Sequence, residues 1–248
     1  MKPKIIIVLL LLFCKYSAYA QTGGKVYYKK IPTERFTKSM DSLNSLYSDN
    51  SFTEIGKKIK DLKFVLQFNS EVAHFKEVES MANDSKSSAS VKIAKITSGY
   101  SGETYYDLKA KKIITNMDIS GEYYLIEKDF SSYEWVLTKE NLIINGLSCY
   151  KAKTTFIKEG RRGVMKIPIV AWYTIDINIS AGPDGFAGLP GLIIQLENDN
   201  YVTMVDKIVI EKKPVEIELP EDGKKMTQTE FNNFMKKMSE SRGSSGRN

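Results

Sequence analysis

Residues 167–179 (IPIVAWYTIDINI) decide the fold of this chain, because apolar residues recur there at every second position. Such alternation is typical of a strand with one buried face, since successive side chains of a strand point to opposite faces. One face collects the apolar residues Ile169, Ala171, Tyr173, Ile175, Ile177 and Ile179, and the other collects Thr174, Asp176 and Asn178. The stretch therefore predicts one long, half-buried strand.

Shorter β-favouring runs continue the pattern on both sides of this stretch. They fall at 24–31, 64–68, 103–108, 112–118, 121–128, 134–138, 141–144, 147–157, 192–197 and 200–211, with turn residues between them. Short connections permit antiparallel hairpins, whereas parallel strands need crossover helices. The sequence predicts a mainly β (α+β) fold: a continuous antiparallel sheet from 64 to 211, curved or closed into an incomplete β-barrel.

Helical spacing is confined to the flanks of this sheet. Residues 34–62 carry two helical stretches, and a capping box at Thr227 and Glu230 predicts a helix over 227–240. We expect the apolar stripe of this helix to pack on the sheet, with partner binding as the alternative; the stripe is Phe231, Phe234, Met235 and Met238. Residues 82–92 and the last eight residues are small or polar and predict a flexible loop and a disordered tail.

The N-terminus has the features of an export signal. Lys2 and Lys4 precede an apolar run over 5–14, and Ala18 and Ala20 supply the small residues that a signal peptidase recognises. The run is too short to span a bilayer, which takes about 20 residues. We expect a signal peptide over 1–20, a β-rich domain over 21–212 and a charged segment over 213–248. The protein would then lie in the periplasm, at the outer membrane or outside the cell.

Composition narrows the chemistry. The formal net charge of the chain is +6, and three lysines of the expected leader account for half of it, which is too weak a charge to predict nucleic-acid binding. Without Cys14 of the leader, Cys149 stands alone and cannot form an internal disulfide. One Cys and one His are too few for a structural zinc site, so we expect neither a metal nor a cofactor.

The connection after the long strand, residues 180–193 (SAGPDGFAGLPGLI), predicts two tight turns. Pro183 with Asp184 and Gly185 suits one turn. Pro190 and Gly191 suit the centre of a type II turn, in which Gly191 would adopt a positive φ. The apolar residues Phe186, Leu189 and Leu192 would dock this loop onto the sheet.

The same segment resembles the defining motif of the GLPGLI family, exported proteins of Bacteroidetes without an established biochemical role. The hexapeptide stands unaltered, and its flanking residues and the upstream run 149–152 (CYKA) are also similar to the family's. The residues of the motif are Trp172, Tyr173, Gly182, Pro183, Phe186, Gly188, Leu189, Pro190, Gly191, Leu192 and Ile193. The resemblance implies export and a related fold, and it brings no catalytic residue with it.

Cys149 is the main candidate for a catalytic residue. A nucleophilic thiol needs a base, and the only histidine is His74, so the sequence leaves a cysteine-dependent hydrolase or thiol enzyme as an alternative. Free cysteines are more often buried packing residues, and we expect that of Cys149. Arg161 and Arg162 are typical of a hairpin tip, although they would also suit a phosphate or lipid headgroup.

Aromatic residues in the strands suggest a binding surface. If the sheet is strongly curved, Tyr106, Tyr124, Trp135, Trp172 and Phe186 could line an apolar concavity, as in the half-barrels that carry lipoproteins or lipids across the periplasm. The sequence therefore favours a non-enzymatic envelope protein that binds a hydrophobic ligand or an envelope protein. The further alternative is a structural accessory of an outer-membrane assembly.

Overall fold

The structure is a computed structural model that describes residues 23–48, 51–78, 89–160, 163–213 and 215–244. The strands in this part of the chain are β1 (Gly24–Pro32), β2 (Lys63–Phe68), β3 (Val72–Glu77), β4 (Glu103–Asp107), β5 (Lys112–Ile119), β6 (Glu122–Asp129), β7 (Val136–Ile144), β8 (Leu147–Gly160), β9 (Gly163–Thr174), β10 (Leu192–Glu197), β11 (Tyr201–Ile210) and β12 (Lys224–Thr227). The helices are α2 (Glu34–Tyr47), α3 (Ser51–Asp61), α4 (Ala89–Thr97) and α5 (Gln228–Ser244). The expected leader, Arg161 and Arg162 lie outside the described residues.

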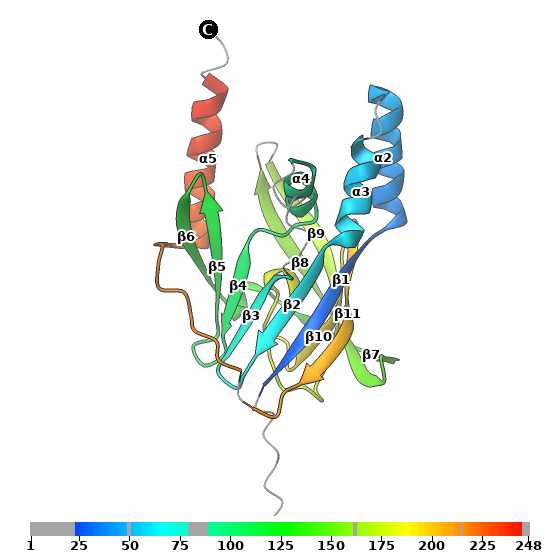
Figure 1. Ribbon diagram of the computed structural model, residues 1–248, viewed down its shortest axis with the longest axis vertical. Coiled ribbons are helices and arrows are strands. Elements are labelled where there is room, and N and C mark those ends of the chain that lie inside the picture. The colour runs from blue at the N-terminus through cyan, green and yellow to red at the C-terminus, as the bar shows by residue number, and fades with distance from the viewer. Residues whose placement is uncertain (1–22, 49–50, 79–88, 161–162, 214, 245–248) are drawn as a thin grey trace, which may run out of the picture.

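The twelve strands form one open sheet, in the order β12-β6-β5-β4-β3-β2-β1-β11-β10-β9-β8-β7 (Figure 1). The prediction of a mainly β fold with a few helices at its periphery is confirmed, and the sheet is not closed into a barrel. Strand β1 lies in the middle, antiparallel to β2 and β11, and alternate residues of it are buried. Its inward side chains are Val26, Tyr28 and Lys30.

Two strands were missed from the sequence. Strand β3 contains His74, and its short run of mixed residues gives only a weak alternating pattern. Strand β12 lies in the charged C-terminal segment, outside the antiparallel sheet predicted from 64 to 211, and it pairs with β6 in parallel. A four-residue strand carries too few apolar residues for periodicity to reveal it.

The long strand predicted over 167–179 ends five residues early, at Thr174. The apolar alternation continues beyond it, but Ile175 is 53% exposed while Ile177 and Ile179 are buried in a turning segment. Burial without a strand produces the same pattern here, because the chain folds inward and packs alternate side chains into the core.

Helices α2, α3 and α4 pack together and form a second, smaller core. Its buried residues are Phe36, Ile59, Ala94 and Tyr201, the last from β11. Thr33 caps α2 by accepting a hydrogen bond from the Phe36 amide. Helix α4 corrects the loop prediction over 82–92: residues 89–92 are helical, and residues 82–88 lie outside the described part.

Helix α5 rises from the end of the sheet, apart from the other helices (Figure 1). It reaches Ser244, so residues 241–244 are helical rather than part of a disordered tail. Phe234 contacts Tyr124 of β6 with 5.3 Å between ring centroids, as the predicted packing on the sheet requires, whereas Met235 is 40% exposed and does not take part in it. No helix in the described residues is long and apolar enough to cross a membrane.

Candidate functional site

The concave side of the sheet is filled by the chain itself. Residues 175–191, here called the connecting loop, run between β9 and β10 and turn into the core, with a short 3₁₀ turn, η2 (Pro183–Gly185), at the centre. The buried side chains of the loop are Ile177, Ile179, Ala181, Pro183, Phe186, Ala187 and Leu189. They join the main core with residues from strands across the sheet, as the apolar underside of this segment predicted.

Aromatic side chains hold the loop through its backbone. The Tyr106 hydroxyl donates to the Gly182 carbonyl at 2.6 Å and accepts from the Gly185 amide at 3.1 Å. The Tyr133 hydroxyl donates to the Gly185 carbonyl at 2.9 Å, and the Trp135 indole donates to the Ala187 carbonyl at 2.8 Å. These contacts satisfy buried backbone groups that an irregular segment cannot pair within itself.

An ion pair fixes the turn at the centre of the loop. Lys30 of β1 is only 1% exposed, and its Nζ lies 2.9 Å from both carboxylate oxygens of Asp184. The same Nζ donates to the Ser98 carbonyl after α4 at 2.7 Å, and Thr203 of β11 donates to Asp184 at 3.2 Å. One buried ammonium thus joins the sheet, the loop and the helix cluster, and every partner in this network has a hydrogen bond.

A second lysine, Lys128, lies near the loop, and unlike Lys30 it has no carboxylate partner among the described residues. Lys128 of β6 donates to the Tyr133 hydroxyl and lies 4.6 Å from the centre of that ring. Burial lowers the pKa of Lys128 to about 8, because the charged form loses its hydration. Burial also raises the pKa of Tyr106 and Tyr133. The tyrosines therefore remain neutral hydrogen-bond donors at physiological pH.

The turn geometry follows the sequence at one site and departs from it at the other. Asp184 and Gly185 adopt positive φ of 56° and 78°, and the Phe186 amide donates to the Pro183 carbonyl at 3.2 Å, which makes the predicted turn. The type II turn at Pro190 and Gly191 is wrong, because Gly191 has no positive φ. Its amide instead donates to the Leu189 carbonyl, and a Cβ on Gly191 would lie 1.9 Å from the Thr174 carbonyl oxygen. Glycine is needed there for close approach of two backbone segments.

The predicted ligand-binding aromatics do not line an open concavity. Tyr106 and Trp135 bind the loop backbone, and Phe186 belongs to the loop and stacks on Tyr133 at 4.6 Å. Tyr124 lies against Phe234 of α5 and donates to Glu122.

Trp172 points to the opposite, convex face of the sheet. Its neighbour Ala171 pairs with Leu196, which pairs with Thr203, and Thr203 contacts the loop residue Asp184. Trp172 therefore faces away from the loop, and its indole donates to Glu197. The sequence could not show which of two adjacent aromatics faces inward.

Cys149 and His74 are not brought together. Cys149 on β8 is fully buried and its Sγ contacts the Leu147 carbonyl, while His74 on β3 pairs with Glu103 at 2.9 Å and stacks on Tyr105. Burial raises the pKa of the Cys149 thiol, which disfavours the thiolate. In the part of the chain that the structure describes, no three His, Cys, Asp or Glu side chains could hold a metal ion together.

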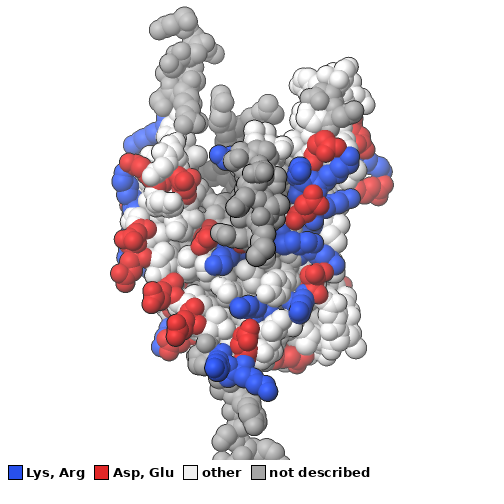
Figure 2. Space-filling view, in the orientation of Figure 1, with Lys and Arg blue, Asp and Glu red and all other residues white. Residues whose placement is uncertain are grey.

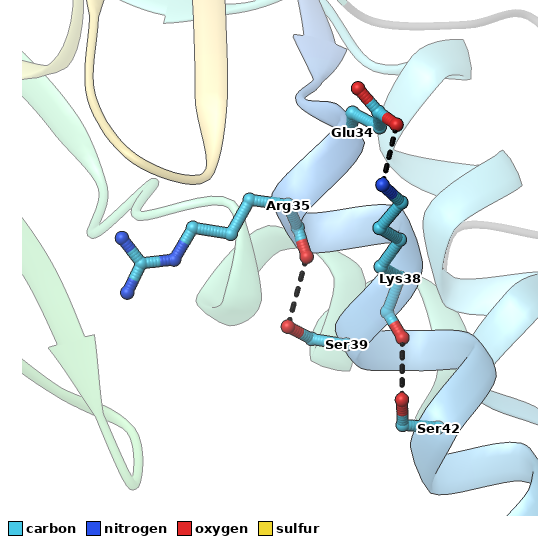
Figure 3. Close-up of a pocket in the computed structure, with 5 residues that line it drawn as sticks. All are labelled: Glu34, Arg35, Lys38, Ser39 and Ser42. Atoms are coloured by element: carbon cyan, nitrogen blue, oxygen red, sulfur yellow. Dashed lines mark hydrogen bonds and ion pairs between the residues drawn. The ribbon is translucent and has the colours of Figure 1, made fainter.

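A shallow pocket lies on α2, far from the loop in sequence (Figure 3). It is lined by Glu34, Arg35, Lys38, Ser39 and Ser42. Lys38 pairs with Glu34, and Arg35 pairs with Asp199. The hydroxyls of Ser39 and Ser42 donate to backbone carbonyls of the helix, so the polar side chains of this pocket already have partners within the protein.

Fold and site define the class: an open β-sheet protein whose concave side is occupied by its own connecting loop. Residues 158–195, which include β9 and this loop, match a family described as "Protein of unknown function (Porph_ging)". This match is consistent with the GLPGLI-type motif. No curated protein matches the sequence.

Among solved structures, the chain is similar to PNGF-II. The structure of PNGF-II in the P21 space group shares 12% identity and a TM-score of 0.50, over 86% of this chain and 32% of that chain. The structure of PNGF-II in the C2 space group gives 13% identity and a TM-score of 0.48, over 85% and 32%. The chain thus spans about a third of the length of PNGF-II, and the likeness is one of fold alone.

Proposed function

We propose that this chain is a non-enzymatic, exported protein of the GLPGLI family that binds another envelope protein through its outer surface. The observation that supports this proposal is the filled concavity: the connecting loop occupies the side of the sheet where a carrier would hold its ligand. A half-barrel that is packed by its own chain offers a rigid exterior rather than an interior binding site.

A carrier of hydrophobic ligands would have to displace the loop. Tyr106 and Tyr133 each bind a carbonyl of this segment in the interior, and Lys30 holds Asp184. Removing the loop would leave these groups buried without partners, at a cost of about 1–3 kcal/mol for each neutral group. The loop is therefore a permanent part of the core in this proposal.

A thiol enzyme is equally disfavoured. A nucleophilic cysteine needs access and a base, whereas Cys149 is covered and the histidine is engaged on a different strand. The Sγ of Cys149 contacts the backbone carbonyl of Leu147. Cys149 serves in packing β8 against the core.

The helix cluster offers the exposed apolar side chains that a partner protein would cover. Ile96 and Ile93 of α4 are 75% and 46% exposed, and Leu46 and Tyr47 at the end of α2 are 72% and 64% exposed. Over α2 and α3, Lys and Arg are interleaved with Asp and Glu, so no patch of a single sign covers this region (Figure 2). Recognition there would rest on apolar contact, as is usual at the centre of protein interfaces.

Site-specific photocrosslinking in cells that make the protein tests this proposal. A photoreactive residue at position 96 should give one discrete adduct with an envelope protein, and Ile93→Glu in the same chain should abolish it. The control places the photoreactive residue at Lys109, an exposed position in the β4–β5 turn. Equal adducts at both positions, or none, would contradict the proposed surface.

Two further measurements test the rejected alternatives. The purified protein should show no saturable binding of fatty acids or of an apolar dye, and iodoacetamide should modify Cys149 only on unfolding. Saturable binding would support a carrier of hydrophobic ligands instead, and rapid alkylation of the native protein would support a thiol enzyme.

A further inference from the structure

The two ends of the sheet differ in how they are protected against pairing with another strand. In the described residues the sheet ends at β12 and at β7. Strand β12 has only four residues and carries the exposed Lys224 and Lys225, which is the usual protection of an edge. Strand β7 has nine residues and exposes apolar side chains on both of its faces: Val136 (66%), Leu137 (56%), Leu142 (40%) and Ile143 (75%).

The sequence of β7, VLTKENLII, is apolar at both ends and polar in the middle. A second strand that lies antiparallel to it must therefore also be apolar at both ends. A copy of β7 meets this requirement, because a two-fold axis through the middle of the strand places the first residues of one copy opposite the last residues of the other. Such an interface uses the same surface twice.

The register follows from the faces of β7. Leu137 and Ile143 pair with Ala152 and Ser148 of β8, which share one face, while Val136 and Ile144 pair with residues of the other face. A two-fold axis perpendicular to the sheet keeps each face in place. Leu137 then lies opposite Ile143 of the second copy, and Val136 lies opposite Ile144.

The middle of β7 fits the same arrangement. Its ladder with β8 shifts between Leu137 and Asn141, so residues 138–140 are irregular, and the two-fold axis sets one irregular segment against the other. Glu140 would meet its own copy near the axis, but Lys151 already binds Glu140 at 2.7 Å and offsets the like charge. The interface leaves no unpaired carboxylate.

We propose that two copies of this chain pair through β7, antiparallel and in this register, into a single continuous sheet. Because both outer edges of the joined sheet are then β12, with its lysines, the assembly ends at two copies. This inference uses a different surface from the helix cluster and is independent of the function proposed above.

Sedimentation equilibrium of the purified exported chain tests the pairing. We expect a monomer–dimer equilibrium, and Ile143→Lys should weaken the dimer at least about tenfold because it sets a charge against Leu137 of the second copy. The control is Ile175→Lys, which alters an exposed isoleucine outside β7 and should leave the equilibrium unchanged. A chain that stays monomeric up to millimolar concentration would overturn the proposal and would favour pairing of β7 with a strand of a different protein.

Mixed disulfide formation tests the register. In a Cys149→Ala background, Leu137→Cys and Ile143→Cys chains should crosslink when mixed and oxidised, because facing residues of paired strands lie within disulfide range. Neither variant should crosslink efficiently alone, since each cysteine would be distant from its own copy. Equal crosslinking of the single variants, or none in the mixture, would rule out this register even if a dimer forms. Circular dichroism of each variant shows that it is folded.

Discussion

At Tyr106, one hydroxyl serves two backbone groups of an irregular segment. It donates to the Gly182 carbonyl and accepts from the Gly185 amide, while the ring is fully buried between the sheet and the loop. Neither backbone group is paired with a neighbouring strand, so the tyrosine hydroxyl supplies the hydrogen bonds that a strand would otherwise provide. The loop is thereby held by hydrogen bonds as well as by packing.

Tyr106→Phe keeps the ring and removes only this hydroxyl. We expect the free energy of unfolding, measured by urea denaturation, to fall by about 1–3 kcal/mol because two buried backbone groups lose their partner. Tyr105→Phe is the matched control: this neighbouring hydroxyl donates to the half-exposed Glu103, and its loss should change stability by less than about 0.5 kcal/mol. Equal effects would show that the loop does not depend on Tyr106.

Lys128 makes a prediction about pH. Its pKa in the folded protein is about 8, below the ordinary 10.5, so the unfolded chain binds more protons between these values and stability from this group rises with pH across that window. Below about pH 8 Lys128 is protonated in the folded protein, so the full cost of burying its charge lowers the free energy of unfolding. Lys128→Met should therefore raise the free energy of unfolding at pH 7 by on the order of 1–2 kcal/mol.

The gain from Lys128→Met should shrink as the pH rises from 8 towards 10, in paired urea titrations of both proteins. The comparison between them removes the contribution of the buried tyrosines, which destabilise the fold only at higher pH. A gain that does not depend on pH would mean that the native amine is not desolvated.

At the scale of elements, the connecting loop shows where local pattern fails. Its apolar alternation predicts strand up to residue 179, yet the backbone leaves the sheet after Thr174, where Gly191 comes too close for any side chain. This approach joins residues that are distant in sequence. A propensity scale assigns Gly191 to a turn and has no means to detect a backbone 17 residues away.

Two glycine substitutions with opposite expected signs test this reading. Gly191→Ala should destabilise the protein by at least about 1–3 kcal/mol, since its Cβ would clash with the Thr174 carbonyl. Gly56→Ala, inside α3, has its nearest contact at 4.0 Å and should stabilise by about 0.5–1 kcal/mol through helix propensity. Thermal and urea unfolding measure both; a neutral Gly191→Ala would show that the loop can shift away from β9.

Elements with a strong periodic pattern could be predicted, and those defined by distant partners could not. Strands β4, β5 and β6 fall where alternation and turn residues place them. Strand β12 depends on β6, about 100 residues earlier, for its existence, and α4 depends on α3 for the burial of Ala94. The sequence singled out the motif, but its aromatic residues were assigned to an empty concavity, because sequence does not show that the motif itself fills the space.

At the scale of the whole molecule, the described parts differ in how far they depend on the common core. The sheet and the connecting loop share one large cluster, and the helices α2, α3 and α4 share a smaller one with Tyr201 of β11. Helix α5 belongs to neither cluster. Stability should therefore decrease from the sheet to the helix cluster and then to α5.

Removal of α5 gives this order a direct test. A chain that ends at Thr227 keeps β12 but loses the contact between Phe234 and Tyr124, and its free energy of unfolding should fall by no more than about 1 kcal/mol. Phe234→Ala in the complete chain should account for most of that loss. Native-state hydrogen exchange should show the least protected amides in α5 and the most protected in β1, β2 and β10. Protection of α5 equal to that of β1 would mean that the helix is stabilised by a partner, such as another copy of the chain, rather than by its own sheet.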